Sequence, residues 1–300
     1  MFVRLRTNTQ SLSIKDSLFS KLLTVSGLFS LGIVSAILFT LLIESKLAIK
    51  QFGVSFFTSL EWNPVIEHYS APIFVAGTLL TSSLAILISI PFTLALSVFL
   101  GEIIKKTLVS KLLNLTLDLL AGIPSVIYGF WGLIILVPIV RNLQLSLGVA
   151  PYGVGILTAA LVLAIMIIPY AASMGRDVIL LIPNDYKEAA FSVGATRYDY
   201  IKKIVLPYAK SGLFSGHIIA FGRAISETMA VTMLIGNANI LPGSIFSPAN
   251  TLASVIANEF PEASDELYLS SLILLAVVLF AMSLLFNLFG RWLTRRGLSK

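Results

Sequence analysis

The stretch DYKEAAFSVGATRYDYIKKIVLP, from Asp185 to Pro207, is a polar island between two long apolar runs. Its distinctive residues are a Glu-Ala-Ala triplet, a Gly-Ala pair and a closing Leu-Pro pair: Glu188, Ala189, Ala190, Gly194, Ala195, Leu206 and Pro207. The island is the longest charged segment between two candidate membrane spans. The side of the membrane on which it lies therefore decides what it can contact.

The composition around the island is that of a membrane protein. Hydrophobic residues make up 57% of the chain and charged residues 12%, whereas roughly a quarter of the residues in a soluble domain are charged. The apolar runs are close to the ~20 residues that a helix needs to cross a bilayer, and the alternating segments of a β-barrel are absent. The chain has no cysteine, which excludes disulfides, thiolate metal sites and cysteine catalysis. We therefore predict an all-α, polytopic integral membrane helical bundle.

Six apolar runs predict six membrane-spanning helices. They cover residues 22–43, about 78–101, about 112–140, 152–175, 212–236 and 268–289. The first run is longer than the apolar part of a signal peptide and no small-x-small cleavage site follows it, so we expect a retained anchor. Glycine and proline punctuate the third run, which indicates a helix inside the bundle. Pro91 and Pro169 are expected to bend the second and fourth helices.

The basic residues predict which loops face the cytoplasm. Four lie before the first span, three after the second, six in the loop that contains the island, and four after the last span. The loops on the other side hold two, one and none. Because basic loops stay cytoplasmic, this distribution of 17 against 3 predicts a multi-pass protein of the cytoplasmic (inner) membrane. Both termini and the polar island are then cytoplasmic.

Three parts are expected along the chain. Residues 1–70 form a cytoplasmic segment, the first anchor and an outer loop, residues 71–290 form the transmembrane core with the cytoplasmic loop 176–211, and residues 291–300 form a cytoplasmic tail. The first outer loop contains Trp62 and the aromatic residues Phe52, Phe56 and Phe57, which favour interfacial helices over disorder.

The island itself is expected to fold as two short helices. Pro183 suits a helix start, acidic residues follow in the first turns, and two alanines continue the pattern, which predicts a helix over 183–192. Gly194 is placed to cap its end, and Thr196 with Asp199 three residues later predicts a second helix. We expect this helix to reach Leu206, where Pro207 bends the chain into the next span. From this pattern alone, an ordinary solvated loop and an elbow that receives a soluble partner both remain open.

The full spacing of the island resembles the EAA signature of ABC importer permeases. Three residues separate the triplet from Gly194, eight separate Ala195 from Ile204, and one separates Ile204 from Leu206. The resemblance covers mainly residues 71–290 and implies a type I ABC importer permease. In that family this loop docks in a groove of a cytoplasmic ATPase and couples nucleotide binding to alternation of the pore. The region of Glu188 and Gly194 would then be the ATPase contact.

Two apolar segments resemble those of phosphate-importer permeases. AGIPSVIYGFWG at 121–132 is similar to their third-span segment, and GRAISETMAV at 222–231 is similar to their fifth-span segment. The Phe130-Trp131 pair and the long first outer loop resemble the PstC-type subunit more than its PstA-type partner. Ser226 departs from the pattern, since a glycine is expected there. The resemblance implies inorganic phosphate as the substrate.

Arg223 and Glu227 are the charges placed deepest in the predicted spans, apart from Asp118 near the end of the third. A charge inside the membrane costs at least ~2.5 kcal/mol, so it marks a pathway or a pair. At a spacing of i, i+4 the two residues share a helical face and can neutralise each other, although Arg before Glu is the weaker order. A guanidinium also matches phosphate oxygens in a bidentate manner.

Two interpretations of this pair stay open. The pair either fixes packing in the bundle, or Arg223 contacts the passing anion while Glu227 keeps it from being held too tightly. In the second case, Thr228 and Thr232 would add hydroxyl donors, and these four residues would line the substrate path.

The chain contains no Walker motif of the form GxxxxGK[ST], so we expect no ATPase activity of its own. We also expect no catalytic residue, metal or cofactor in this chain. The resemblance implies that ATP and Mg²⁺ are bound by a partner ATPase. It also implies a second permease subunit, two cytoplasmic ATPase subunits and an extracytoplasmic phosphate-binding protein as partners, in membrane lipid and without nucleic acid. The alternatives are a permease for another oxyanion, such as sulfate or molybdate, and a secondary ion-coupled anion transporter. A membrane-embedded enzyme is disfavoured, because no nucleophile–base constellation is present.

Overall fold

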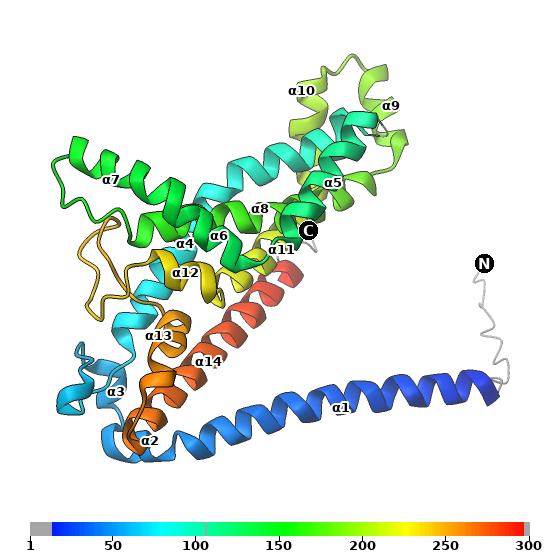
Figure 1. Ribbon diagram of the computed structural model, residues 1–300. Helices are drawn as coiled ribbons and strands as arrows, with labels where there is room; N and C mark the ends of the chain where they lie inside the picture. The colour runs from blue at the N-terminus through cyan, green and yellow to red at the C-terminus, as the bar shows by residue number, and fades with distance from the viewer. Residues whose placement is uncertain (1–13, 106, 297–300) are drawn as a thin grey trace.

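The computed structural model describes residues 14–105 and 107–296 and is helical (Figure 1). Within these residues, β-pairing is limited to an isolated bridge between Asn63 and His68. The segments η2, η3 and η4 are π-helical turns, and η1 and η5 are 3₁₀ turns. In chain order the elements are α1 Ile14–Glu44, α2 Lys46–Phe52, α3 Ser55–Thr58, η1 Pro64–Ile66, α4 Pro72–Val98, η2 Phe99–Ile103, α5 Leu108–Gly122, α6 Ser125–Trp131, η3 Gly132–Leu136, α7 Val137–Ser146, α8 Ile156–Leu180, α9 Asn184–Ser192, α10 Arg197–Tyr200, η4 Ile201–Val205, α11 Leu206–Ile225, α12 Met229–Leu234, α13 Leu252–Glu259, η5 Phe260–Glu262 and α14 Glu266–Arg296.

Six helical segments among the described residues are long and apolar enough to cross a membrane, which confirms the predicted number of spans. They cover Phe19–Glu44, Pro72–Ile103, Ser125–Ser146, Ile156–Leu180, Arg197–Ile225 and Glu266–Thr294. In Figure 1, α9 and α10 lie together at one end of the bundle, while α2, α3 and α13 lie towards the other. We call these the α9 end and the α13 end.

α8 is the most buried of the spans and packs against both α4 and α11. Small residues allow this close approach, because a short side chain lets helix backbones come near each other in a membrane. Ala160 and Ala172 of α8 are fully buried. Gly175 lies against Ser97 of α4 and Leu213 of α11, where a Cβ atom would collide with both side chains. The core is therefore centred on α8.

The third span differs from the single helix predicted over about 112–140. α5 ends at Gly122, and a new helix begins at Ser125 and continues through a π-helical turn to Ser146. Ile123 adopts an extended conformation, with φ −66° and ψ 127°, because the residue before a proline avoids the helical region. Pro124 therefore separates α5 from the span, and the predicted boundary at Leu112 was wrong.

The fifth span also differs from the prediction of 212–236. A continuous helix runs from Arg197 to Ile225, so the second helix of the island and the span are one rod. The π-helical turn η4 immediately precedes α11, and Pro207 occupies the second position of α11. A π turn takes up one extra residue, which accommodates a proline that has no N–H to donate. The helix then breaks after Ile225 and resumes as α12.

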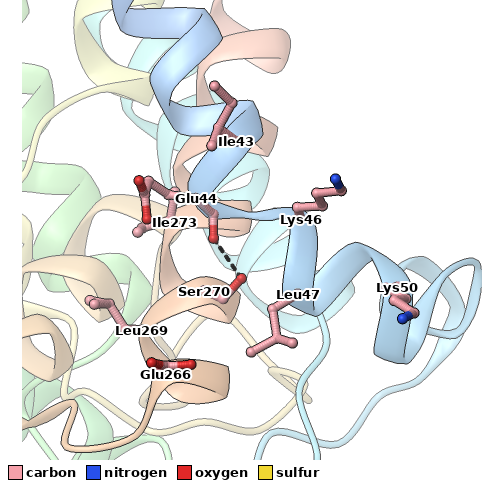
Figure 2. Close-up of a pocket in the computed structure, with 9 residues that line it drawn as sticks. All are labelled: Ile43, Glu44, Lys46, Leu47, Lys50, Glu266, Leu269, Ser270 and Ile273. Atoms are coloured by element: carbon pink, nitrogen blue, oxygen red, sulfur yellow. Dashed lines mark hydrogen bonds between the residues drawn. The ribbon is translucent and has the colours of Figure 1, made fainter.

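α1 leaves the bundle, and its residues 19–44 are exposed or half-buried (Figure 1). Its attachment is at its C-terminal end, where Ser270 of α14 accepts a hydrogen bond from the Ala48 N–H at 3.1 Å and donates one to the Glu44 carbonyl at 2.7 Å. Figure 2 shows the pocket at this junction, in which Leu47 and Leu269 lie on either side of Ser270. The first anchor is thus fastened at one point rather than packed along the core.

An aromatic cluster closes the α13 end. The helices expected after the first span are present as α2 and α3, and the segment that follows them buries Trp62. The Trp62 ring lies 4.9 Å from Tyr69 in an edge contact, and Tyr69 stacks on Tyr268 at 5.4 Å. Burial, together with nearby carboxylates, raises the pKa of Tyr69 to about 12, so this tyrosine is neutral. The cluster ties the loop after the first span to α14.

Candidate functional site

The elbow between α9 and α10 is built by local backbone chemistry. Gly194 has a φ of +80°, a conformation that glycine adopts without the steric cost of a Cβ atom. The Ala195 N–H donates to the Ala190 carbonyl at 3.0 Å, and the Gly194 N–H donates to the Phe191 carbonyl at 3.0 Å. These two bonds form a Schellman motif, which ends α9 as predicted.

The second arm begins at the predicted cap. The Thr196 hydroxyl accepts a hydrogen bond from the Asp199 N–H at 3.2 Å and donates to the Asp199 carboxylate at 2.6 Å. The other oxygen of Asp199 lies 2.8 Å from the Lys203 ammonium, one turn further along the rod. The start of α10 is therefore fixed by its own first turn.

The residues of the signature divide between an inner and an outer face. Ala190 is buried, and Ala195 and Leu206 pack beside it in an apolar cluster at the base of the elbow. Glu188, Ala189, Gly194 and Pro207 are exposed. Among the described residues, the Glu188 side chain has no hydrogen-bond or ion-pair partner.

Exposed apolar side chains surround this outer face. Val193 is 82% exposed and Tyr198 68% exposed, on the two sides of Gly194, and Phe191 is 41% exposed. Exposed apolar groups beside polar ones are typical of protein–protein contact surfaces. The outer face of the elbow is therefore suited to a protein partner.

The two segments that resemble phosphate-importer permeases lie against each other. Gly129 of α6 faces α12, where an added Cβ atom would lie 2.7 Å from the Met233 sulfur and 3.1 Å from the Ala230 Cα atom. Gly132, at the start of η3, faces Leu234 in the same way. Gly129 and Gly132 thus allow α6 and η3 to pack closely on α12, whereas a Cβ atom added at Gly122 would meet no atom within 4 Å in the described chain.

Arg223 lies on α11 two residues before the helix break, and its side chain is exposed. Its guanidinium carbon lies 4.4 Å from the ring centroid of Tyr170 on α8, which is a cation–π contact. The Tyr170 hydroxyl donates to the Ala121 carbonyl at 2.8 Å, and the Tyr128 hydroxyl donates to the Leu120 carbonyl at 2.9 Å. These hydroxyls satisfy two of the last carbonyls of α5, which have no partner inside their own helix.

The predicted helical pairing of Arg223 with Glu227 is wrong. α11 ends at Ile225, so the two residues are no longer one turn apart on a single helix face, and no ion pair joins them in the described part of the chain. Thr228 donates to the Ser226 carbonyl at 3.4 Å, and Thr232 donates to the Thr228 carbonyl at 2.8 Å. Arg223, Glu227 and Thr228 therefore lie at or beside the break between α11 and α12, and Thr232 lies one turn into α12.

A known protein family matches most of this chain. The binding-protein-dependent transport system inner membrane component family matches residues 93–297. The chain belongs to this family. Its members are the permease subunits of ABC importers, so this protein is a multi-pass membrane permease.

Several relatives of this permease are named as phosphate transport proteins. The chain is 37% identical to the phosphate transport system permease protein PstC of Mesorhizobium japonicum over 95% of its own length and 91% of the relative's. It is 41% identical to the protein of the same name from Pasteurella multocida, over 92% and 91% of the two chains. The resemblance to phosphate-importer permeases predicted from the sequence is thereby confirmed.

Solved structures confirm the fold class of the permease. A chain of a bacterial ABC transporter involved in the import of the acidic polysaccharide alginate superposes with a TM-score of 0.62 at 16% identity, covering 95% of this chain and all of that one. An inward-facing MetNI methionine ABC transporter gives a TM-score of 0.53 at 20% identity, covering 73% and 90%. At these identities the likeness concerns the fold alone, which is that of a type I ABC importer permease.

Two residues of this permease were missed at the sequence level. Tyr170 lies under Arg223 although 53 positions separate them, and an aromatic residue in an apolar run gives no signal of such a contact. Glu102 is buried beside Lys187 of α9, although it directly follows an apolar run and resembles an ordinary loop residue in the sequence. No group of three or more potential metal ligands is found among the described residues.

Proposed function

We propose that this permease is a membrane-spanning subunit of an ATP-driven importer of inorganic phosphate and forms half of its translocation path. The observation that carries the proposal is the exposed guanidinium of Arg223 beside the break between α11 and α12. It occurs in a chain whose similarity to phosphate transport permeases extends over 92–95% of its length. A guanidinium presents two parallel donors that match two oxygens of a tetrahedral oxyanion.

Arg223 is the anion contact in this proposal. Its stack on Tyr170 supports that role, because the ring orients the guanidinium without using any of its five N–H donors. Glu227, two residues beyond the end of α11, opposes tight retention of the anion by its negative charge. Thr228 and Thr232 supply hydroxyls along the same path after their protons turn away from the backbone carbonyls.

Energy enters at the elbow. The outer face with Glu188, Ala189 and Gly194 docks on a cytoplasmic ATPase, and the exposed Val193 and Tyr198 supply its apolar contacts. That surface is connected to the body of α11 through Ala190, Ala195, Leu206 and Pro207. Since η4 and α11 continue the second arm without interruption, a displacement of the elbow is carried along a rigid rod towards Arg223.

The working assembly contains this chain, a PstA-type second permease subunit, two PstB-type ATPase subunits and a PstS-type phosphate-binding protein on the outer side. ATP and Mg²⁺ belong to the ATPase subunits, and this chain holds no cofactor, metal or catalytic residue. The α9 end faces the cytoplasm together with both termini, which agrees with the basic residues counted in those loops.

The test is uptake of labelled phosphate by the complete complex in proteoliposomes. The wild-type complex is expected to import phosphate only when ATP is present on the elbow side. Arg223→Gln is expected to assemble with its partners and to lose uptake by roughly tenfold or more, because a hydrogen bond to a charged group contributes about 1.5–3 kcal/mol. Normal uptake by this variant would sink the assignment of Arg223.

Three further measurements sharpen the test. Glu227→Gln separates a role in release from simple charge balance, since only a role in release changes the maximal rate with little change in apparent affinity. Excess sulfate or molybdate is expected to leave phosphate uptake unchanged, and strong competition by either would transfer the proposal to that oxyanion. Ion-coupled flux by the chain alone, without ATPase subunits, would defeat it.

A further inference from the structure

Glu102 is a nearly buried carboxylate at the end of the second span. Its side chain is 3% exposed, and it lies in η2, the π-helical turn that continues α4. An ionised carboxylate out of contact with water is strongly destabilising unless cations or donors compensate it. A π turn in a long helix is also frequent at functional positions.

Each oxygen of Glu102 has its own ammonium partner. The Lys187 Nζ atom lies 2.5 Å from Oε1, and the Lys105 Nζ atom lies 3.3 Å from Oε2. Lys105 is three residues further along the same segment, so its pairing with Glu102 is local. Lys187 belongs to α9, 85 residues away in the chain, and therefore joins the elbow to the second span.

Other contacts hold the second arm of the elbow to the same turn. Arg197, the first residue of α10, donates a hydrogen bond to the Ile103 carbonyl at 3.2 Å. Gly101 lies against Ile179 near the end of α8, where a Cβ atom would be 2.8 Å from the Ile179 side chain. The turn η2 is thus contacted by α8, α9 and α10 together.

A route from the elbow into the membrane continues through α4. The Thr93 hydroxyl of α4 lies 2.7 Å from the Nε2 atom of His217 on α11. The Nδ1 atom of His217 lies 2.7 Å from the Leu213 carbonyl, which fixes the orientation of the ring. α11 also carries Arg223. The elbow is therefore connected to the helix of the anion site by two routes, one along the rod through η4 and the other through η2 and α4.

We propose that Glu102 is a positioning residue for energy coupling, and that its ion pair with Lys187 transmits movement of the α9 elbow to α4. This inference rests on the proposed function, because it requires an ATPase that moves the elbow. Within α9, Ala190 is the buried residue, the Tyr186 ring lies 5.8 Å from that of Tyr208 on α11, and Lys187 makes the ion pair with the second span. Without the Lys187 contact, α9 keeps its apolar contacts but loses its ion pair with the second span, so the elbow moves while α4 stays in place.

The chain offers a matched pair of variants for the test. Lys187→Gln and Lys105→Gln each remove one ammonium from the same carboxylate and each leave Glu102 paired with the other lysine, so neither creates an unpaired buried charge. The two lysines are also similarly shielded, at 29% and 28% exposure. They differ in that Lys187 lies on the elbow and Lys105 does not.

The measurements are ATP hydrolysis, phosphate uptake and recovery of the ATPase subunits with the purified complex. In Lys187→Gln we expect the ATPase subunits to be recovered and hydrolysis to stay within about twofold of wild type. Phosphate imported per ATP is expected to fall on the order of tenfold, within the 5–150-fold range typical of coupling between sites. Lys105→Gln and the charge-preserving Lys187→Arg are expected to behave like wild type, and Glu102→Gln like Lys187→Gln.

Three outcomes would overturn the inference. Equal ratios of uptake to hydrolysis in Lys187→Gln and Lys105→Gln would remove the role of the pair. A parallel loss of hydrolysis, uptake and bound ATPase in Lys187→Gln would make it a simple docking or folding contact. A wild-type complex that imports no phosphate with ATP would overturn the proposed function, and this inference with it, before any variant is compared.

Discussion

At the scale of single residues, the anion site depends on what supports Arg223. Its ring partner Tyr170 has two separate tasks, since the ring lies under the guanidinium and the hydroxyl satisfies a terminal carbonyl of α5. Tyr128 performs the second task alone, at the neighbouring carbonyl of Leu120. The two tyrosines therefore allow the ring contact and the hydroxyl contact to be measured separately.

Tyr170→Leu is expected to reduce phosphate uptake more than Tyr170→Phe does. Both variants lose the hydrogen bond to the Ala121 carbonyl, which costs about 1 kcal/mol of stability, but the leucine also loses the cation–π contact with Arg223. That contact is worth about 0.5–1 kcal/mol at an exposed site, so uptake at low phosphate should differ roughly two- to fivefold between the variants. Tyr128→Phe is the control, with lower thermal stability and unchanged uptake per assembled complex. Equal uptake by both Tyr170 variants would rule out a role for the ring.

Residues whose role is local were predictable from the sequence, and residues paired over distance were not. Gly194 and Thr196 act on backbone groups within a few positions, so their identity and spacing were enough to predict the caps. The Arg223–Glu227 pairing failed because it assumed that the helix continues beyond Ile225, which tertiary packing decides. Glu102 and Lys187 are 85 positions apart, and no local pattern relates them.

At the scale of elements, apolar length predicted the number of spans but not their ends. The third span was predicted to begin too early, because α5 is apolar enough to read as part of it although Pro124 separates the two. The fifth span was predicted to begin too late, because the charges of the island hid a helix that runs into the membrane without a break. Hydropathy shows which stretches of a chain are apolar, whereas the ends of a helix depend on backbone hydrogen bonding.

Packing of α14 on α11 gives a prediction about one pair of residues. Gly290 lies against the side chain of Ile218, and a Cβ atom added there would collide with the branches of the isoleucine. Gly290→Ala should therefore destabilise the permease by about 1–3 kcal/mol, the usual cost of overpacking. In an Ile218→Ala background, which removes those branches, the same substitution should cost close to nothing.

This double-mutant cycle is measured by thermal unfolding of the wild type, the two single variants and the double variant in one detergent. Gly222→Ala is the control, because its nearest neighbour is the Asn287 side chain at 3.5 Å, an ordinary contact distance. Strictly additive effects of Gly290→Ala and Ile218→Ala would contradict direct packing between these positions.

At the scale of the whole molecule, a carboxylate gathers separate segments at each end of the bundle. Glu102 does so at the α9 end, and Glu259 does so at the α13 end. Glu259 accepts hydrogen bonds from Trp62 at 2.8 Å, from Tyr268 at 2.7 Å and from Asn239 at 2.7 Å. These donors come from the loop after the first span, from α14 and from the loop after α12. A transporter that opens its two ends in turn needs each end to move as a unit, and both carboxylates provide such a connection.

Glu259→Gln is expected to loosen the α13 end while leaving the α9 end unchanged. The amide keeps one acceptor oxygen for three donors and turns an NH₂ group towards them, which should cost about 1–3 kcal/mol, the penalty for leaving buried partners unsatisfied. Hydrogen exchange of the purified permease should therefore become faster in residues 60–70 and 237–260 and stay the same in α9 and α10. Glu262→Gln, three residues further on and exposed, removes the same charge without touching the three donors and is the matched control. If exchange in these residues is no faster in Glu259→Gln than in Glu262→Gln, the hydrogen bonds of Glu259 do not hold the α13 end together.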